Sequence, residues 1–454
     1  MESLKLGYIP LAKANFDTVQ AGKDSRIVLD VLNRIEQVDV ISQPVTMLDS
    51  EISSTIQTFR ESGIDALLVH FCTFCLGSIL PALAVNLDVP VILLGSPEPD
   101  FSGNRLRNNS FCALNMNAHT MYKLRKKYRA VFHAPDDPQL DAKLRIIFSS
   151  LHTLKNLKNK RIGLIGSRAP GFYTSNFNEL KLREVLGVEV EHIDISKVYV
   201  GAEKIGQEVV AHEGEELLQS IDYNTRVVNE HLDKLVRAKI AVSNLADEYR
   251  LDAYAIKCWP EFHVDYGIAV CPTLGMMNSR GLPTACEGDV YGAVTMMMQR
   301  MITGQVSFFA DFIFSEMHKN TGLFWHCGSA PMELAEERSS VVLNNFSIVQ
   351  EGTPDKGCVT DFEVNSKGKN VTINRIGTDA DDRFRILNIT GEGTESDHTL
   401  RGNYCQVRFN NPLQGILDGV LENGFEHHYS IVMEDISAVV QEIAFWKGFE
   451  VYNY

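Results

Sequence analysis

The first 115 residues alternate between short apolar runs and longer amphipathic stretches. The apolar runs "LKLGYIP", "VDVISQ", "ALLVHF" and "VPVILLG" have the length of strands, and segments 26–35 and 49–61 between them have helical spacing. Strands that alternate with helical crossovers are typical of a parallel sheet. The pattern therefore predicts a Rossmann-like, doubly wound α/β domain.

The pattern changes twice more along the chain. A second alternating unit begins at "KNKRIGLIGSRAPGF" and continues through "VEVEHIDIS" and "LDAYAIKCW", after a helical segment that serves as the linker. Beyond about residue 340, short strands and turn residues dominate, as in "KGKNVTINRIG" and "RFRILNITGEG", and a helix closes the chain. We predict two doubly wound α/β domains, residues 1–157 and 158–340, and a β-rich, barrel-like domain, residues 341–454.

Length and composition agree with a multidomain globular protein. The 454 residues are enough for two to four domains at about 100–200 residues each. No apolar run approaches the roughly 18–20 residues that cross a bilayer, and the first residues have no signal-peptide pattern, so we expect a cytoplasmic protein with no membrane partner. A net charge of −15 disfavours nucleic acid as a partner and suits divalent cations.

The nine cysteines are scattered, mostly in apolar stretches, which is typical of reduced, buried thiols. One CxxC pair occurs, in "HFCTFC", and a second such pair is absent from the sequence. A structural zinc site is therefore not expected.

The segment "PTACEGDVYGAV" places two acids, Glu287 and Asp289, where an apolar helix begins. Apolar residues then recur at helical spacing, and Gly304 follows as a stop, which predicts a helix over residues 287–302. Acids in a first helical turn are stabilised by the helix dipole, so helix capping is the simpler explanation of the pair on this segment alone, and a functional site is the alternative.

Asp311 is harder to explain by a purely structural role. It interrupts an apolar run, "SFFADFIF", whose residues favour a strand rather than a turn, and an ionised carboxylate in that setting needs compensation. His326 and the pair His427 and His428 also lie in apolar or glycine-flanked segments. Carboxylates and histidines from separate elements form the ligand set of a cation such as Mn²⁺.

The segment "ACEGDVYGAVTMMMQRMITGQVSFFADF" resembles the central signature of the L-fucose isomerase and L-arabinose isomerase superfamily. In L-fucose isomerases two metal-binding acids have the spacing of Glu287 and Asp311, 24 positions apart. The third ligand is a histidine shortly before the last helix, which corresponds to His428. "IKCWPEF", with Trp259, resembles the strand end near the sugar. His326 matches a metal ligand of the arabinose branch, or it orients a ligand or the sugar, which we favour.

This resemblance implies a metal-dependent aldose–ketose isomerase. Glu287 and Asp311 would bind Mn²⁺, or Mg²⁺ or Co²⁺, and also move the proton through a cis-enediol, although a hydride shift is the alternative. The family also implies a homo-oligomer, a hexamer in which the first domain of one subunit closes over a neighbour's active site.

The expected substrate is an open-chain monosaccharide: an L-fucose-like deoxy sugar, a pentose, or the sulfonated hexose sulfoquinovose. Arg280, with Arg168, His318 and Lys319, is a candidate for a sulfonate, and His427 for a substrate or supporting contact. Two other functions remain open. A metal-dependent sugar aldolase or lyase also uses a metal-stabilised enediolate, and a non-catalytic sugar-binding sensor also has two α/β domains.

Overall fold

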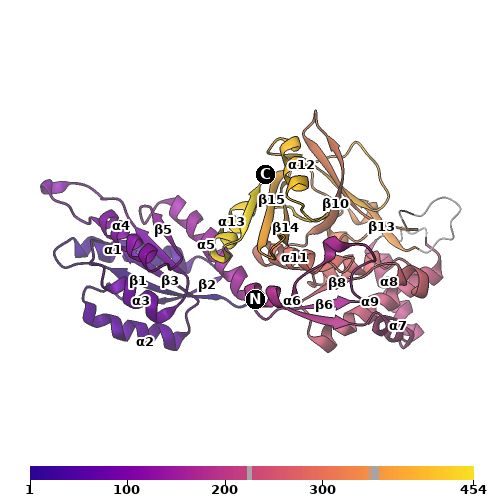
Figure 1. Ribbon diagram of the computed structural model, residues 1–454, viewed down its shortest axis with the longest axis horizontal. Helices are drawn as coiled ribbons and strands as arrows, with labels where there is room; N and C mark the ends of the chain where they lie inside the picture. The colour runs from indigo at the N-terminus through magenta and orange to yellow at the C-terminus, as the bar shows by residue number, and fades with distance from the viewer. Residues whose placement is uncertain (222–226, 347, 349–356) are drawn as a thin grey trace. The chain divides into compact units, whose positions relative to one another are not determined.

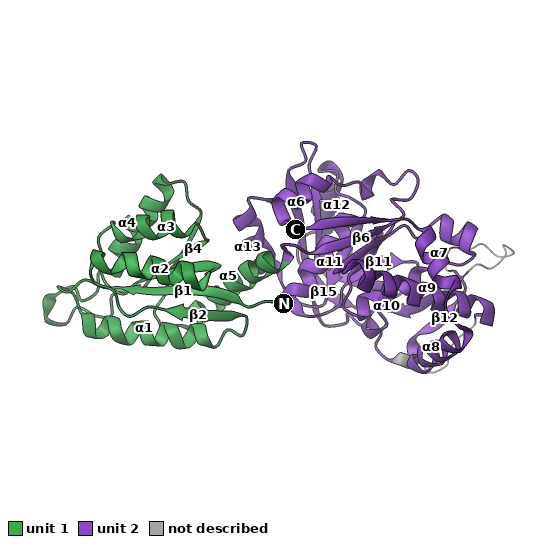
Figure 2. Cartoon of the chain, turned by 90° about the horizontal axis from the view of Figure 1, so that it is seen from below, with its two compact units in different colours: residues 1–156 green, residues 157–454 purple. Residues whose placement is uncertain are grey.

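The computed structural model describes residues 1–221, 227–346, 348 and 357–454. The chain divides into two compact units, residues 1–156 and 157–454, coloured separately in Figure 2. Among the described residues, no helix is both long and apolar enough to cross a membrane. The predicted division into three domains stays a prediction.

The first unit is built on a parallel sheet, part of which is labelled in Figure 1, and its strands follow the order β2-β1-β3-β4-β5. This order is that of a doubly wound sheet, whose switch point lies between β1 and β3. The strands are β1 (Leu4–Leu11), β2 (Val38–Ser42), β3 (Ala66–Phe71), β4 (Val91–Gly95) and β5 (Tyr128–Phe132). The helices are α1 (Thr18–Asn33), α2 (Ile52–Ser62), α3 (Ile79–Leu87), α4 (Ser110–Lys123) and α5 (Pro138–Leu157).

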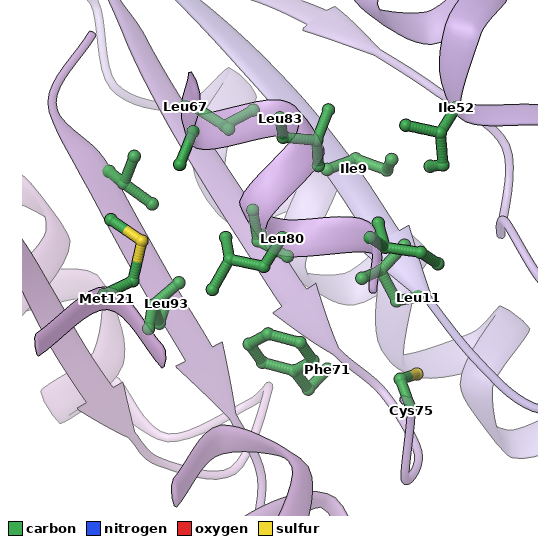
Figure 3. Packing of buried hydrophobic residues seen from close by; sticks show 14 of the residues in the cluster. Ile9, Leu11, Ile52, Leu67, Phe71, Cys75, Leu80, Leu83, Leu93 and Met121 are labelled. Atoms are coloured by element: carbon green, nitrogen blue, oxygen red, sulfur yellow. The ribbon is translucent and has the colours of Figure 1, made fainter. Parts of the chain in front are cut away.

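Strands β3 and β4 are buried along their whole length, which explains their continuous apolar sequences. Their side chains pack with those of α2, α3 and α4 in one core. Figure 3 shows Phe71, Leu80, Leu83 and Leu93 meeting within it. The interpretation of this segment as strands and crossover helices is confirmed.

The second unit begins with another parallel sheet, in the order β7-β6-β8-β9. Its strands are β6 (Arg161–Ile165), β7 (Glu189–Ile193), β8 (Ala253–Ile256) and β9 (Thr284–Cys286). Helices α6 (Glu179–Leu186), α7 (Ser196–Glu203), α8 (Gln207–Ser220), α9 (Asn229–Tyr249), α10 (Cys271–Ser279) and α11 (Val290–Thr303) accompany it.

Six antiparallel strands close into a barrel in the second unit. Each pairs with the next in the order β16-β11-β10-β17-β14-β15, and β15 pairs back onto β16. Strands β12, β13 and β18 extend it. Their bounds are β10 (Phe308–Glu316), β11 (Thr321–His326), β12 (Val342–Asn344), β13 (Val359–Glu363), β14 (Asn370–Thr378), β15 (Phe384–Thr394), β16 (Asn403–Phe409), β17 (His428–Val432) and β18 (Glu450–Asn453), with helices α12 (Leu413–Glu422) and α13 (Ser437–Lys447).

The barrel draws two of its strands, β10 and β11, from residues before 340. The mixed α/β fold with parallel sheets and a C-terminal barrel agrees with the predicted architecture.

Helix α11 joins the parallel sheet of the second unit to the barrel. It contacts β6, β8 and β9 on one side and β14 and β17 on the other. Residues 290–299 are buried all round, as expected for a helix packed on every side. The helix begins at Val290, not at Glu287 as its apolar spacing predicts, because Glu287 and Gly288 adopt left-handed backbone angles, with φ of 59° and 72°.

Candidate metal centre

The functional side chains gather where the carboxyl ends of β6, β8 and β9 meet the barrel. Glu287 is the first residue after β9, and His428 is the first residue of β17. Asp311 lies on β10, which pairs with β17 so that Asp311 stands directly opposite His428. Ligand sites of open α/β sheets commonly lie outside the carboxyl ends of the strands, and the cluster lies at this edge of the sheet.

A tight turn aims Glu287 into the cluster. At the next position, a Cβ on Gly288 would lie 2.1 Å from the carbonyl oxygen of Ser167 in the loop after β6. Only glycine fits there, because φ is 72° and the neighbouring backbone fills the space. In the segment "CEGD", the strand ends at Cys286, the chain turns at Glu287 and Gly288, and α11 begins at Val290.

The polar atoms of this cluster face one another at short distances. Nε2 of His427 and Nε2 of His428 lie 3.3 Å and 3.5 Å from Oε2 of Glu287. Nε2 of His428 lies 3.8 Å from Oδ1 of Asp311. Within the described residues, both of these last two atoms are buried without a hydrogen-bond partner. Unpaired buried polar atoms are costly, so this arrangement fits a cation between them.

Asp289, the second acid of the pair, both caps α11 and supports His428. Its Oδ1 accepts the Gly292 N–H at 2.8 Å, and its Oδ2 lies 3.0 Å from Nδ1 of His428. Oδ2 also accepts a hydrogen bond from Arg375, and both charged side chains are fully buried.

Burial alone would raise the pKa of Asp289, but the charge of Arg375 and the hydrogen bond with His428 hold it well below its usual range. An ionised carboxylate can only accept, so Nδ1 of His428 carries a proton, and in the neutral ring Nε2 presents a lone pair. Metal-binding histidines are commonly oriented in this way by a carboxylate.

The pKa of Glu287 is also lowered. Its burial acts in the opposite direction, but the hydrogen bond from His427 and the charges that His428 and His326 carry when protonated outweigh the cost of desolvation. The carboxylate of Glu287 is therefore ionised at neutral pH, as both a metal ligand and a proton acceptor must be.

His427 is held between two elements. Its Nδ1 lies 2.9 Å from Oγ1 of Thr174 and its Nε2 faces Glu287. Burial lowers its pKa, but the bond to Glu287 and the nearby acids raise it overall. Trp259 contacts the same carboxylate through Nε1, at 3.4 Å from Oε1, and the ring of Phe172 packs against both Trp259 and His427.

His326, the last residue of β11, lies beside His428, with ring centroids 5.9 Å apart. Its Nδ1 accepts the backbone N–H of Cys327 at 2.9 Å, so the neutral ring carries its proton on Nε2. This arrangement favours a supporting position over direct metal binding.

Arg280 is not brought to this cluster. It follows α10, at the amino end of β9, and donates to Ser243 on α9. Lys319 is paired with Glu316 and Asp397 in the turn between β10 and β11. Arg168, by contrast, lies in the loop after β6 that packs on Gly288, with its guanidinium 4.9 Å from the ring centre of Tyr173.

Two residues of the site were missed from the sequence. Asp289 was weighed with Glu287 as a helix cap or a functional acid, but it is not among the predicted site residues. Arg375 carried a signal, because "NVTINRIG" places it on the same strand face as Val371 and Ile373, where a charge is unexpected. Its partner lies 86 residues away along the chain, and no local pattern reveals that pairing.

The donor set fits a divalent metal. Glu287, His427 and His428 each offer a ligand atom, all within 4.8 Å of one another, and Asp311 adds a carboxylate next to His428. Carboxylate oxygen and imidazole nitrogen suit hard to borderline cations.

Known proteins resemble this chain along nearly its whole length. Residues 7–157 match the family described as fucose/sulfoquinovose isomerase, N-terminal domain. The chain is 27% identical to a sulfoquinovose isomerase of Alkalicoccus urumqiensis, over 96% of both chains. It is 25% identical to one of Priestia aryabhattai, over 98% of this chain and 97% of the relative. A third, from Clostridium sp. (strain MSTE9), is 23% identical over 96% of both. The chain is therefore similar to fucose and sulfoquinovose isomerases, in its first 157 residues by the family match and along nearly its whole length by these relatives.

Proposed function

We propose that this protein is a metal-dependent aldose–ketose isomerase that acts on an open-chain sugar, with sulfoquinovose as the preferred substrate. The observation that carries the proposal is that Glu287, Asp311 and His428 lie together. Nε2 of His428 and Oδ1 of Asp311 are buried and have no hydrogen-bond partner among the described residues. Similarity to sulfoquinovose isomerases over nearly the whole chain supports the sugar class.

Glu287, Asp311 and His428 would hold the ion, and we propose Mn²⁺, with Mg²⁺ or Co²⁺ as substitutes. When bound, such an ion supplies Lewis-acid stabilisation of the negative charge that develops on the sugar oxygens. Asp289 and Arg375 keep His428 in the tautomer that this role needs.

The carboxylates of Glu287 and Asp311 would divide the proton transfer. One carboxylate removes the proton from C2 of the open-chain aldose while O1 gains a proton, which gives a cis-enediol. A proton is then delivered to C1 as O2 loses its own, and the ketose forms. Proton transfer by a positioned carboxylate contributes about 10²–10⁴-fold to such a rate. Trp259 contacts Glu287 and Phe172 packs against Trp259, so these rings would exclude water from the reacting edge.

A sulfonate on the far end of the sugar needs a cationic contact, and the loop after β6 offers Arg168. We expect Arg168→Ala to raise KM for sulfoquinovose by about 10–100-fold, the scale of one charged hydrogen bond, and to leave KM for a sugar without a sulfonate little changed. Arg280→Ala is the matched control, since Arg280 lies at the opposite end of β9. Equal losses on both sugars, or a larger effect of Arg280→Ala, would contradict this assignment.

The overall proposal is tested by NMR in D₂O. Metal-stripped protein, with and without Mn²⁺, is incubated with L-fucose, L-arabinose, D-arabinose, D-glucose and sulfoquinovose. We expect manganese-dependent ketose formation from sulfoquinovose, with deuterium at C2 of the recovered aldose. Ketose without deuterium would indicate a hydride shift. Products with fewer carbons would support a lyase, and tight binding without turnover a sensor.

A further inference from the structure

Two thiols lie directly beside the metal centre in the second unit. Cys286 is the last residue of β9 and Cys258 lies two residues beyond the end of β8, the strand that pairs with β9. Their sulfur atoms are 3.0 Å apart, and both side chains are buried. The isomerisation proposed above uses neither of them.

Glu287 connects this thiol pair to the histidines. One donor atom from each of Cys258, Cys286 and Glu287 lies within 4.8 Å of the other two. The same holds for Glu287 with His427 and His428. The carboxylate of Glu287 therefore belongs to two groups of possible ligands, one with two thiols and one with two imidazole rings.

The two donor sets select different cations. Thiolates favour soft or borderline ions such as Zn²⁺ and Cd²⁺, whereas carboxylate and imidazole suit Mn²⁺. In a tetrahedral zinc site with Zn–S bonds of about 2.3 Å, the two sulfurs are about 3.8 Å apart. The thiols of Cys258 and Cys286 would separate by less than one ångström to reach that distance, and Cys258 lies in a loop.

We propose that Cys258, Cys286 and Glu287 form a second cation site, specific for thiophilic ions such as Zn²⁺ and Cd²⁺. Each thiol releases its proton to solvent as the ion binds. Occupation of this site withdraws Glu287 from His428 and Asp311, and so inhibits the isomerase. The inhibition rests on the function proposed above, but the binding does not.

The experiment is a titration of metal-stripped, full-length protein with Cd²⁺, followed by the ultraviolet thiolate-to-cadmium charge-transfer absorbance. The unmodified protein should develop this band and saturate. Cys258→Ser and Cys286→Ser should each lose it. The matched control is Cys271→Ser, because Cys271 belongs to a second thiol pair, 3.2 Å from the sulfur of Cys327, and should keep the band.

A band that survives both Cys258→Ser and Cys286→Ser, or that Cys271→Ser abolishes, overturns the proposal. Because a buried serine at position 286 can disturb folding, Cys258→Ser is the decisive variant, and its circular dichroism is compared with that of the unmodified protein.

A second measurement follows inhibition of the Mn²⁺-loaded enzyme by Zn²⁺, relative to each variant's own uninhibited rate. Loss of a ligand should raise the half-inhibitory Zn²⁺ concentration on the order of tenfold or more in Cys258→Ser, because even outer contacts contribute about 10–100-fold to metal affinity. An unchanged value contradicts the inhibitory role. If the protein has no isomerase activity, the cadmium absorbance still decides whether the site binds.

Discussion

The two parallel sheets of this protein have the same strand order at their first four positions, but the buried histidines nearby, one on β3 and one on the barrel strand β17, have opposite environments. In the first unit, His70 on β3 is fully buried and its Nδ1 faces the hydroxyl of Tyr8 at 2.9 Å and the sulfur of Cys72 at 3.4 Å. In the second unit, His428 is equally buried but contacts Glu287, Asp289 and Asp311.

Burial alone does not make a histidine a metal ligand. Desolvation lowers the pKa of His70 to about 3, so this ring is a neutral core residue with uncharged neighbours. His428 has a carboxylate that fixes its proton on Nδ1 and two more that share its open Nε2 side. The acids, rather than the histidine, distinguish the candidate metal centre from the core.

The largest expected effect comes from removing an acid of the second unit. Glu287→Gln should lower metal-dependent turnover by about 10²–10⁴-fold or more, since it removes both a ligand and a proton acceptor. Asp24→Asn changes a buried acid of the first unit and should leave turnover within a few-fold. Steady-state assays of both variants make the measurement. Comparable losses of turnover in the two variants would contradict a special role for the acids of the second unit.

Replacing each histidine tests the difference between the two environments. His428→Gln should weaken Mn²⁺ binding at least as much as the loss of an outer contact, about 10–100-fold, whereas His70→Gln should leave the affinity unchanged. Isothermal titration with Mn²⁺ measures both. An unaltered affinity in His428→Gln would contradict its assignment as a ligand.

The buried ion pair that supports His428 should be visible in stability. Arg375→Met leaves Asp289 charged and buried without its partner, and should lower the free energy of unfolding by about 3–5 kcal/mol. Arg383→Met, in an exposed pair with Asp379, should change it little. Urea denaturation compares the two variants, and equal stabilities would show that the buried pair contributes no more than a surface one.

The smallest effect is a pH dependence in the first unit. The folded pKa of His70, about 3, lies below its ordinary value of 6.5, so the unfolded chain binds more protons between these limits. Stability is therefore lost as pH falls below about 6.5, by about 1.4 kcal/mol per pH unit from this residue. Denaturation of the full chain between about pH 7 and pH 5 should show this slope, and His70→Gln should lack it. If the stability of the unmodified protein and that of His70→Gln changed equally with pH, a neutral His70 would be contradicted.

Much of the fold follows from local pattern. The strand over residues 66–71 was predicted with its observed bounds, because β3 is buried on both faces and its sequence is continuously apolar. Asp311 was placed on a strand because its apolar and aromatic neighbours exclude a turn, and β10 contains it. The start of α11 was misplaced because helical spacing does not reveal the left-handed turn at Glu287 and Gly288.

The site was only partly accessible from the sequence. Glu287, Asp311 and the histidines were found because charged residues in apolar segments need an explanation, and a family resemblance supplied one. Arg375 and the second role of Asp289 depend on contacts between distant elements. Arg280 was singled out because it lies near a motif loop in the sequence, and this proximity does not tell which end of β9 the residue occupies.

The most direct test of the central claim is a crystal structure with Mn²⁺, using anomalous scattering at the manganese absorption edge. We expect one strong peak between Glu287, Asp311 and His428, with Nε2 of His428 as the nitrogen ligand. A peak elsewhere, for example at the exposed group of His212, Glu213 and Glu216 on α8, with none at Glu287, would contradict it.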